Sequence, residues 1–320
     1  MKDRFQYLDN SKAILIVLVI LGHVIQGSIE DYQHNPIFRF IYSFHMPLFL
    51  AISGYLTYKP KYDSGLIKKR AVQLLVPFVI WAFLSPILQN GVADIDAALN
   101  VLLYPDNGLW FLYNLFVYSA FFNISEWISE KFAKKQELIL CAFVFLLVCA
   151  MAVFKTKFNC SQLCWYLPFF VIGYYMRKYS ELVEKRESLI LMLGGVIFVV
   201  GMPFWMMRED PLFYKWINLG VAFAYLYRWV VMMAGCVFFF ILGKRYLNMP
   251  LKLLNKLGRK TLGIYALQFT ILHYLGVLLP VENLYMNILF QTVACVIICD
   301  FLTVGISKVK YIRTLLIGES

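Results

Sequence analysis

The chain has 320 residues, of which 61% are hydrophobic, 18% aromatic and only 15% charged, and its formal net charge is +11. A water-soluble domain of this size cannot bury so much apolar surface, so the composition excludes an ordinary soluble protein and indicates a membrane protein. The positive charges flank apolar segments and form no single groove or helix face. They favour a role in membrane topology and contact with anionic lipid over nucleic-acid binding.

Apolar runs long enough to cross a bilayer recur along the chain, with short charged stretches between them. They predict an all-α integral membrane protein with about ten transmembrane helices, at residues 12–27, 36–58, 66–88, 108–124, 137–154, 162–179, 188–206, 217–242, 260–279 and 285–306. Helices are expected because an open strand leaves its backbone groups unpaired in lipid. Since the predicted loops are short, we expect one membrane domain over residues 1–320, with no attached soluble domain.

Lys and Arg are unevenly divided between alternate loops, which predicts the orientation of the bundle. One set of loops and termini carries most of them: Lys2, Arg4, Lys59, Lys61, Lys68, Lys69, Arg70, Lys131, Lys134, Lys135, Arg177, Lys178, Lys185, Arg186, Lys244, Arg245, Lys252, Lys256, Arg259, Lys260, Lys308, Lys310 and Arg313. The opposite set holds Lys155, Lys157, Arg208 and Lys215, and its loop at 89–107 has neither Lys nor Arg. Because positive segments stay in the cytosol during insertion, both termini are predicted to be cytosolic.

A few polar side chains fall inside the predicted spans, where they are costly and mark candidate sites. Lys12 and His23 lie about three turns apart on one face of the first helix, roughly 16 Å along its axis. With the predicted topology, His45 and His273 lie at a depth in the outer half similar to that of His23. Arg228 and Gln268 lie near the middle of their spans.

Simpler interpretations of these residues remain open. A membrane histidine can serve only as a hydrogen bond between helices, and Lys68, Lys69 and Arg70 can be topology signals alone. Lys12 can extend to the interface. The histidines lack HxxH-type spacing, and the cysteines lack zinc-ligand spacing, so no metal is expected.

Six segments, read together, resemble one known family. They are YLDNSKAILIVLVILGHVI and FIYSFHMPLFLAISGYL near the N-terminus, and then KKRAVQLLVPFVIW, NGLWFLYNLF, WYLPFFVIGYY and LGRKTLGIYALQ. In this order they resemble the acyltransferase 3 family of integral membrane acyltransferases, over most of the chain.

The resemblance implies transfer of an acyl group, commonly acetyl from cytosolic acetyl-CoA, to a hydroxyl of a cell-envelope polysaccharide or lipid-linked sugar. It implies a location in the bacterial cytoplasmic (inner) membrane. It also implies that Lys12 helps to hold the CoA donor, that His23 takes part in catalysis and that Arg70 binds CoA phosphates. Two positions depart from the family pattern. Gln73 stands where many members repeat an arginine, and Gln268 stands where related segments carry a histidine.

Elementary chemistry is compatible with this activity. CoA is polyanionic, so we expect its nucleotide end to bind Lys12, Lys69, Arg70 and Arg4, and its thioester to reach His23. An imidazole can act as the general base for an acceptor hydroxyl near neutral pH, and an acyl-histidine intermediate is the alternative.

The remaining candidates are residues that support the acceptor or the helices: His45, Trp110, Tyr55, Asp9, Gln268 and Arg228. Among them, an amide such as that of Gln268 can orient a substrate but cannot act as a base. The rival hypothesis is a proton-coupled secondary transporter or flippase of a sugar or lipid-linked substrate, because intramembrane Lys, His and Arg suit that function too.

Overall fold

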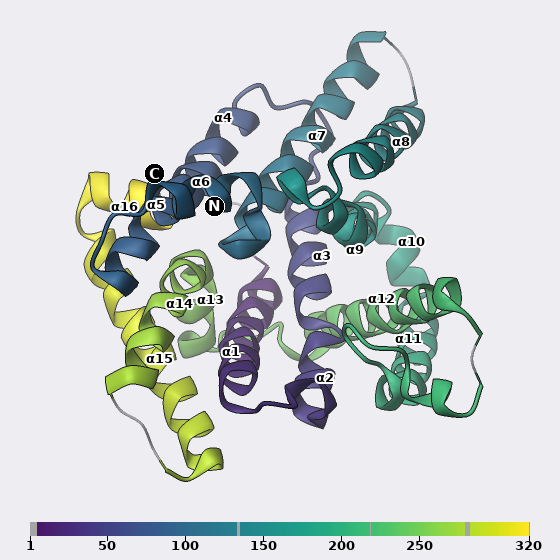
Figure 1. Cartoon of the computed structure of the whole chain (residues 1–320). Coiled ribbons are helices and arrows are strands. Elements are labelled where there is room, and N and C mark those ends of the chain that lie inside the picture. The colour runs from purple at the N-terminus through teal and green to yellow at the C-terminus, as the bar shows by residue number, and fades with distance from the viewer. Residues whose placement is uncertain (1–4, 133–134, 218, 279–281, 320) are drawn as a thin grey trace.

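The computed structural model describes residues 5–132, 135–217, 219–278 and 282–319 (Figure 1). Within these ranges the chain forms helices and no strand, which confirms the prediction of an all-helical fold. The α-helices are α1 Gln6–Ser28, α2 Pro36–Tyr42, α3 His45–Thr57, α4 Leu66–Arg70, α5 Val76–Asn90, α6 Ile95–Leu103, α7 Trp110–Phe132, α8 Gln136–Phe154, α9 Cys160–Lys178, α10 Ser180–Lys185, α11 Glu187–Gly201, α12 Val221–Tyr246, α13 Lys252–Arg259, α14 Thr261–Leu278, α15 Leu284–Ser307 and α16 Lys310–Ile317.

Eight segments of the described chain are long and apolar enough to cross a membrane: Gln6–Ser28, Pro36–Thr57, Leu66–Asn90, Gln136–Phe154, Glu187–Phe204, Val221–Tyr246, Thr261–Leu278 and Leu284–Ser307. Each coincides with a predicted span to within several residues. The chain is therefore a multi-pass membrane protein.

The two other predicted spans coincide with α7 and α9, which are 23 and 19 residues long. These helices are less apolar because polar groups on them face the interior of the bundle. On α7, Asn114 is buried and accepts a hydrogen bond from Asn159 at 2.8 Å, just before α9 begins. The Tyr118 hydroxyl donates to the Leu163 carbonyl of α9 at 2.7 Å. Partners on or next to α9 thus satisfy the Asn114 amide oxygen and the Tyr118 hydroxyl, which lipid would leave unpaired.

The most enclosed helices are α1 and the α2–α3 pair, which lie at the centre of the bundle (Figure 1). The apolar windows of these spans are 67% and 72% buried, whereas those of α8 and of the α11 span are each 11% buried. The peripheral helices therefore present their apolar side chains outward, as a bilayer requires. Lys12, His23 and His45 all lie on the central helices.

Glycines let the central helices approach their neighbours closely. A Cβ on Gly173 of α9 would lie 1.9 Å from the Ala51 carbonyl oxygen of α3, and one on Gly54 would lie 2.1 Å from the Phe170 carbonyl oxygen of α9. At the start of α1, a Cβ on Gly258 of α13 would lie 1.8 Å from the Asp9 carbonyl oxygen. These contacts place α3 against α9 and the start of α1 against α13.

Two membrane segments are not regular α-helices. The Pro36–Thr57 span breaks at Ser43 and Phe44, between α2 and α3, where the buried Ser43 hydroxyl donates to the Phe40 carbonyl at 2.7 Å. In the Leu66–Asn90 span, a π-helical turn, η2 (Ala71–Leu75), follows Arg70. Pro77 cannot donate a backbone hydrogen bond to the carbonyl of Gln73, which removes one α-helical hydrogen bond at the end of this turn.

Candidate functional site

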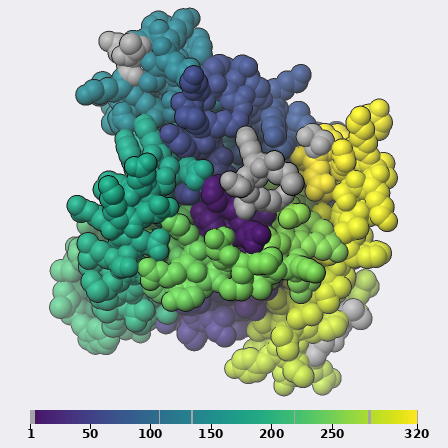
Figure 2. Space-filling model, turned by 180° about the vertical axis from the view of Figure 1, so that it is seen from behind, coloured from purple at the N-terminus to yellow at the C-terminus, as the bar shows by residue number. Residues whose placement is uncertain are grey.

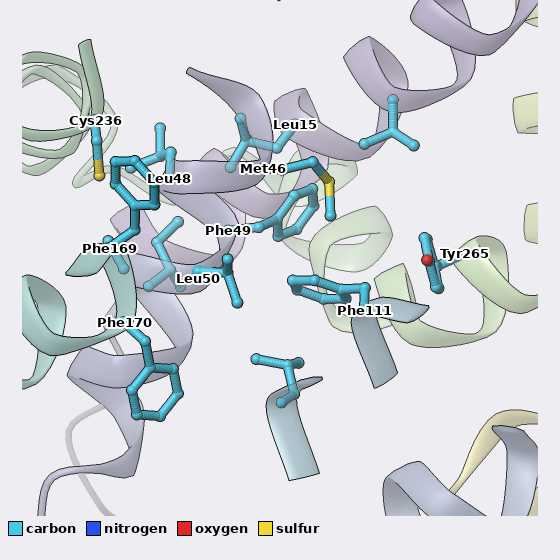
Figure 3. Packing of buried hydrophobic residues seen from close by; sticks show 14 of the residues in the cluster. Leu15, Met46, Leu48, Phe49, Leu50, Phe111, Phe169, Phe170, Cys236 and Tyr265 are labelled. Carbon is cyan, nitrogen blue, oxygen red and sulfur yellow. The ribbon is translucent and has the colours of Figure 1, made fainter. Parts of the chain in front are cut away.

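A narrow cavity of about 100 Å³ lies among α1, α3, α7 and α14. Its lining combines the polar side chains Lys12, Ser53 and Thr261 with apolar and aromatic ones: Ile16, Val19, Met46, Phe49, Phe111, Leu115, Leu262 and Tyr265. Figure 3 shows Met46, Phe49 and Phe111 converging, with the Tyr265 ring across from Phe111 at 5.6 Å between ring centroids. The cavity is therefore largely apolar, with one cation, Lys12, in its lining.

Lys12 enters this cavity already paired with a carboxylate. Its Nζ lies 2.8 Å from Oδ1 of Asp9, one turn earlier on α1, and Arg259 of α13 lies 3.8 Å from the other Asp9 oxygen. Asp9 is buried, whereas the Lys12 side chain keeps 21% of its exposure. The carboxylate can therefore orient Lys12 while leaving N–H donors of the ammonium free for a ligand.

We call the end of the bundle that holds Lys12, α4 and α13 the basic end. In Figure 2 the start of α1 (purple) lies between the green segment that contains α13 and the blue segment that contains α4. Lys68 and Lys69 are exposed there, and Arg70 is half-buried. Among the described residues, none forms an ion pair or hydrogen bond with the Arg70 guanidinium. Arg4, the other predicted donor-binding residue, lies outside the described residues.

The end of helix α16 packs both on the π-helical turn that follows Arg70 and on the start of α14, close to the cavity. Gly318 ends α16 with a positive φ of 65° and packs on the carbonyl of Gln73, where a Cβ would lie 2.0 Å from the oxygen. One residue earlier, Ile317 packs against Gly263, near the start of α14 and two residues after the cavity residue Thr261. Arg70 and Lys12 thus belong to the same end of the bundle, although no direct contact joins them in the described part of the chain.

The loop before α4 is held to α7. Asn123 accepts a hydrogen bond from the Asp63 backbone N–H at 3.2 Å and donates to the Asp63 carbonyl at 3.0 Å. Hydrogen bonds from Lys59 and from the Gly65 backbone N–H hold the pKa of the Asp63 carboxyl below its usual range. This anchor fixes the point at which α4, and with it Arg70, begins.

Near the lining residues Val19 and Met46 lie four polar side chains, His23, Gln26, Tyr42 and His45, which we call the histidine cluster. Gln26 lies one turn beyond His23 and within hydrogen-bonding reach of its ring. The Tyr42 hydroxyl donates to the Gln26 side chain at 3.3 Å, and the Tyr42 ring lies 4.7 Å from that of His45. Gly22 makes room for Tyr42, since a Cβ there would lie 2.7 Å from its ring.

The break between α2 and α3 determines the tautomer of His45. Its Nδ1 lies 2.7 Å from the Ile41 carbonyl oxygen, and a carbonyl can only accept, so Nδ1 carries the proton. The ring of His23 is held differently, by a contact of 4.7 Å between ring centroids with Phe269 of α14. Of the two histidines, His45 is buried and His23 is partly open, so His23 is the more accessible imidazole.

Gln268 lies between the cavity and the histidine cluster along α14. Its side chain is fully buried at 0% exposure, and neither Nε2 nor Oε1 has a hydrogen-bond partner among the described residues. Tyr265, one turn earlier, lines the cavity, and Phe269, the next residue, contacts His23.

Comparison with known protein families shows to which family this chain belongs. The sequence model of the family described as an acyltransferase domain matches residues 5–304, nearly the whole chain. The chain belongs to the acyltransferase 3 family. The match confirms the resemblance drawn from the six segments.

Two nodulation proteins are similar to this acyltransferase 3 family member. Nodulation protein NolL of Mesorhizobium japonicum is 35% identical over 140 residues, which cover 38% of this chain and 37% of that protein. Nodulation protein NolL of Sinorhizobium fredii is 30% identical over 215 residues, which cover 57% of this chain and 50% of that protein. The chain thus spans half or less of the length of these curated relatives. No solved structure matches it.

In this acyltransferase 3 family member, three polar residues singled out in the sequence lie apart from the cavity. Tyr55 accepts a hydrogen bond from Arg177 at 3.1 Å, near the ends of α3 and α9. Arg228 is buried, but it donates to the carbonyl of Glu209 in the loop before α12. His273 is exposed on α14. The described residues contain no group of three or more His, Cys, Asp or Glu side chains that could hold a metal ion.

Trp110 stacks on a partner that the sequence did not single out. Its ring lies 4.9 Å from that of Tyr166 on α9, at an interplanar angle of 21°. Tyr166 in turn interacts electrostatically with Tyr42 of the histidine cluster. The only sequence signal for Tyr166 is its place in the family-like segment WYLPFF.

Proposed function

We propose that this protein is a membrane O-acyltransferase. It moves an acyl group, in the simplest case acetyl, from CoA at the basic end to a hydroxyl of a cell-envelope glycan or lipid-linked sugar. That hydroxyl lies beside the histidine cluster. The observation that carries the proposal is the cavity that begins at Lys12 and extends to Val19 and Met46. His23 lies one turn beyond Val19, and His45 precedes Met46. Membership of the acyltransferase 3 family supports the reaction class.

The donor half of the proposal rests on charge. The phosphates of CoA need cations, and Lys12, Lys69 and Arg70 supply them at the basic end, together with Arg4. A half-buried guanidinium without an anionic partner, such as that of Arg70, suits an anionic ligand. The pantetheine arm is slender and only weakly polar, which suits the narrow, largely apolar cavity. With the orientation that the loop charges predict, this end faces the cytosol of a cell whose inner membrane holds the protein.

The chemical step needs one base. Neutral His23 takes the proton of the acceptor hydroxyl as its oxygen attacks the thioester carbonyl. The new C–O bond forms, the C–S bond breaks, and the proton passes from His23 to the departing thiolate. General base catalysis of this kind contributes about 10² to 10⁴ in rate. The acceptor sugar stacks on Trp110 and Tyr166, beside the histidine cluster.

Purified protein in nanodiscs, given acetyl-CoA labelled in the acetyl group and envelope glycan, tests this function. We expect labelled glycan, and a loss of about 10² or more in rate for His23→Ala. His273→Ala is the matched control, because His273 is exposed on α14 and lies apart from the cavity, so it should keep the wild-type rate. If the protein moves glycan across the vesicle membrane without labelling it, the protein is a transporter. Full activity of His23→Ala would exclude His23 as the general base.

A further inference from the structure

Gln268 is unusual among the buried amides of this protein. A primary amide offers two N–H donors and an acceptor oxygen, and burying it without partners costs free energy. Elsewhere the fold provides partners: Gln136 bonds to Tyr174 and Lys178, and Gln291 bonds to Asn287. Within the described chain, only Gln268 has both its buried amide nitrogen and its buried amide oxygen unpartnered. Such a group requires an explanation, and a ligand is one.

The position of Gln268 indicates which ligand atom it would meet. Along α14, Thr261 and Tyr265 line the cavity with Lys12, and Phe269 contacts the ring of His23. Gln268 lies one turn beyond Tyr265, about 4.5 Å further along the helix axis. Along the α14 axis, Gln268 therefore lies between the end of the cavity and the residue that contacts His23. A donor thioester extending from the basic end would present its carbonyl at this level.

We propose that the Gln268 amide is the oxyanion donor of the acyl transfer, an inference that rests on the proposed function. When the acceptor oxygen bonds to the thioester carbon, the carbonyl electron pair moves to oxygen and forms an oxyanion. The Nε2–H of Gln268 donates to that oxyanion, and Oε1 accepts from an N–H of the pantetheine arm. Collapse of the intermediate breaks the C–S bond and restores the carbonyl, while His23 returns the proton to sulfur. An amide is suited to this role because it remains a neutral donor at any physiological pH.

The variant Gln268→Met keeps the length of the side chain and removes its polar atoms. We expect kcat to fall by about 10² to 10³, as for other lost oxyanion donors, with little change in acetyl-CoA affinity. The ligand-free variant should melt at the same temperature as the wild type or higher, because an unpaired buried amide has been replaced by an apolar group. A merely structural glutamine would show the opposite, with lower stability and an unchanged kcat.

Gln291→Met is the matched control, since this amide is bonded to Asn287 at 3.0 Å and should lose stability while kcat stays constant. Gln268→His, which keeps an N–H donor, should retain more activity than Gln268→Met. The inference is overturned if Gln268→Met keeps the wild-type kcat, or if its kcat falls only in proportion to the folded fraction. Absence of acetyl transfer by the wild type would instead count against the proposed function itself.

Discussion

In the described structure, Lys12 in the cavity lining forms an ion pair with Asp9. The carboxylate is 5% exposed and also faces Arg259, so two cations surround it. A cation oriented in this way can bind a phosphate or a pantetheine oxygen without reordering its own side chain.

Lys12→Met should therefore weaken donor binding more than the chemical step. A charge-assisted hydrogen bond contributes about 1.5 to 3 kcal/mol, so we expect KM for acetyl-CoA to rise tenfold or more, at a kcat within about threefold of the wild type. Steady-state kinetics over a range of acetyl-CoA concentrations measure this effect. Lys185→Met, at an exposed lysine of α10, is the control. An unchanged KM for Lys12→Met would mean that Lys12 only supports the helices.

Part of the site could be predicted residue by residue. The helical period alone places Lys12 and His23 on one face of α1. Lys12 lines the cavity, and His23 lies one turn beyond the lining residue Val19. Tyr42 of α2 could not be predicted. Its contact with Gln26 of α1 depends on the space that Gly22 leaves on α1, because glycine has no side chain. The sequence groups Tyr55 with residues that support the acceptor or the helices, yet Tyr55 lies ten residues after His45, about 15 Å along the helix.

The position of His45 at the start of α3 depends on the contact between α3 and α9. Gly173→Ala would push a methyl group into the Ala51 backbone, which cannot move aside as a flexible side chain would. We expect a loss of about 3 kcal/mol in stability, measured as a lower midpoint of unfolding in detergent. Gly276→Ala, within α14, has no atom within 4 Å of the new methyl and should be neutral or slightly stabilising. Equal midpoints for the two variants would contradict the close packing.

The elements themselves were predictable to different degrees. Long apolar runs specify the peripheral helices α8 and α11, since these face lipid almost all round. The break after Ser43 carries local hydrogen bonds, from the Ser43 hydroxyl to the Phe40 carbonyl and from the His45 ring to the Ile41 carbonyl, which apolar periodicity does not record. The same holds for α7, whose buried Asn114 is acceptable only because Asn159 lies beside it in space.

At the scale of the whole molecule, the loop charges predict which end faces the cytosol. Cysteine placed at Lys61, in the loop between α3 and α4, should react with a membrane-impermeant maleimide only after cells are permeabilised. Cysteine placed at Asp94, in the loop that lacks Lys and Arg, should react in intact cells. The wild type, with its own seven cysteines, gives the background. The reverse labelling pattern would invert the bundle and put the basic end outside.

The proposed reaction carries an acyl group from the basic end of one bundle to the histidine cluster. Proteoliposomes of known orientation, with labelled acetyl-CoA supplied only to the basic end and a glycan acceptor only to the other side of the membrane, test it most directly. We predict labelled glycan in the acceptor compartment, and none when His23→Ala replaces the wild type. Acetylation only when donor and acceptor share one compartment would exclude transfer across the bundle.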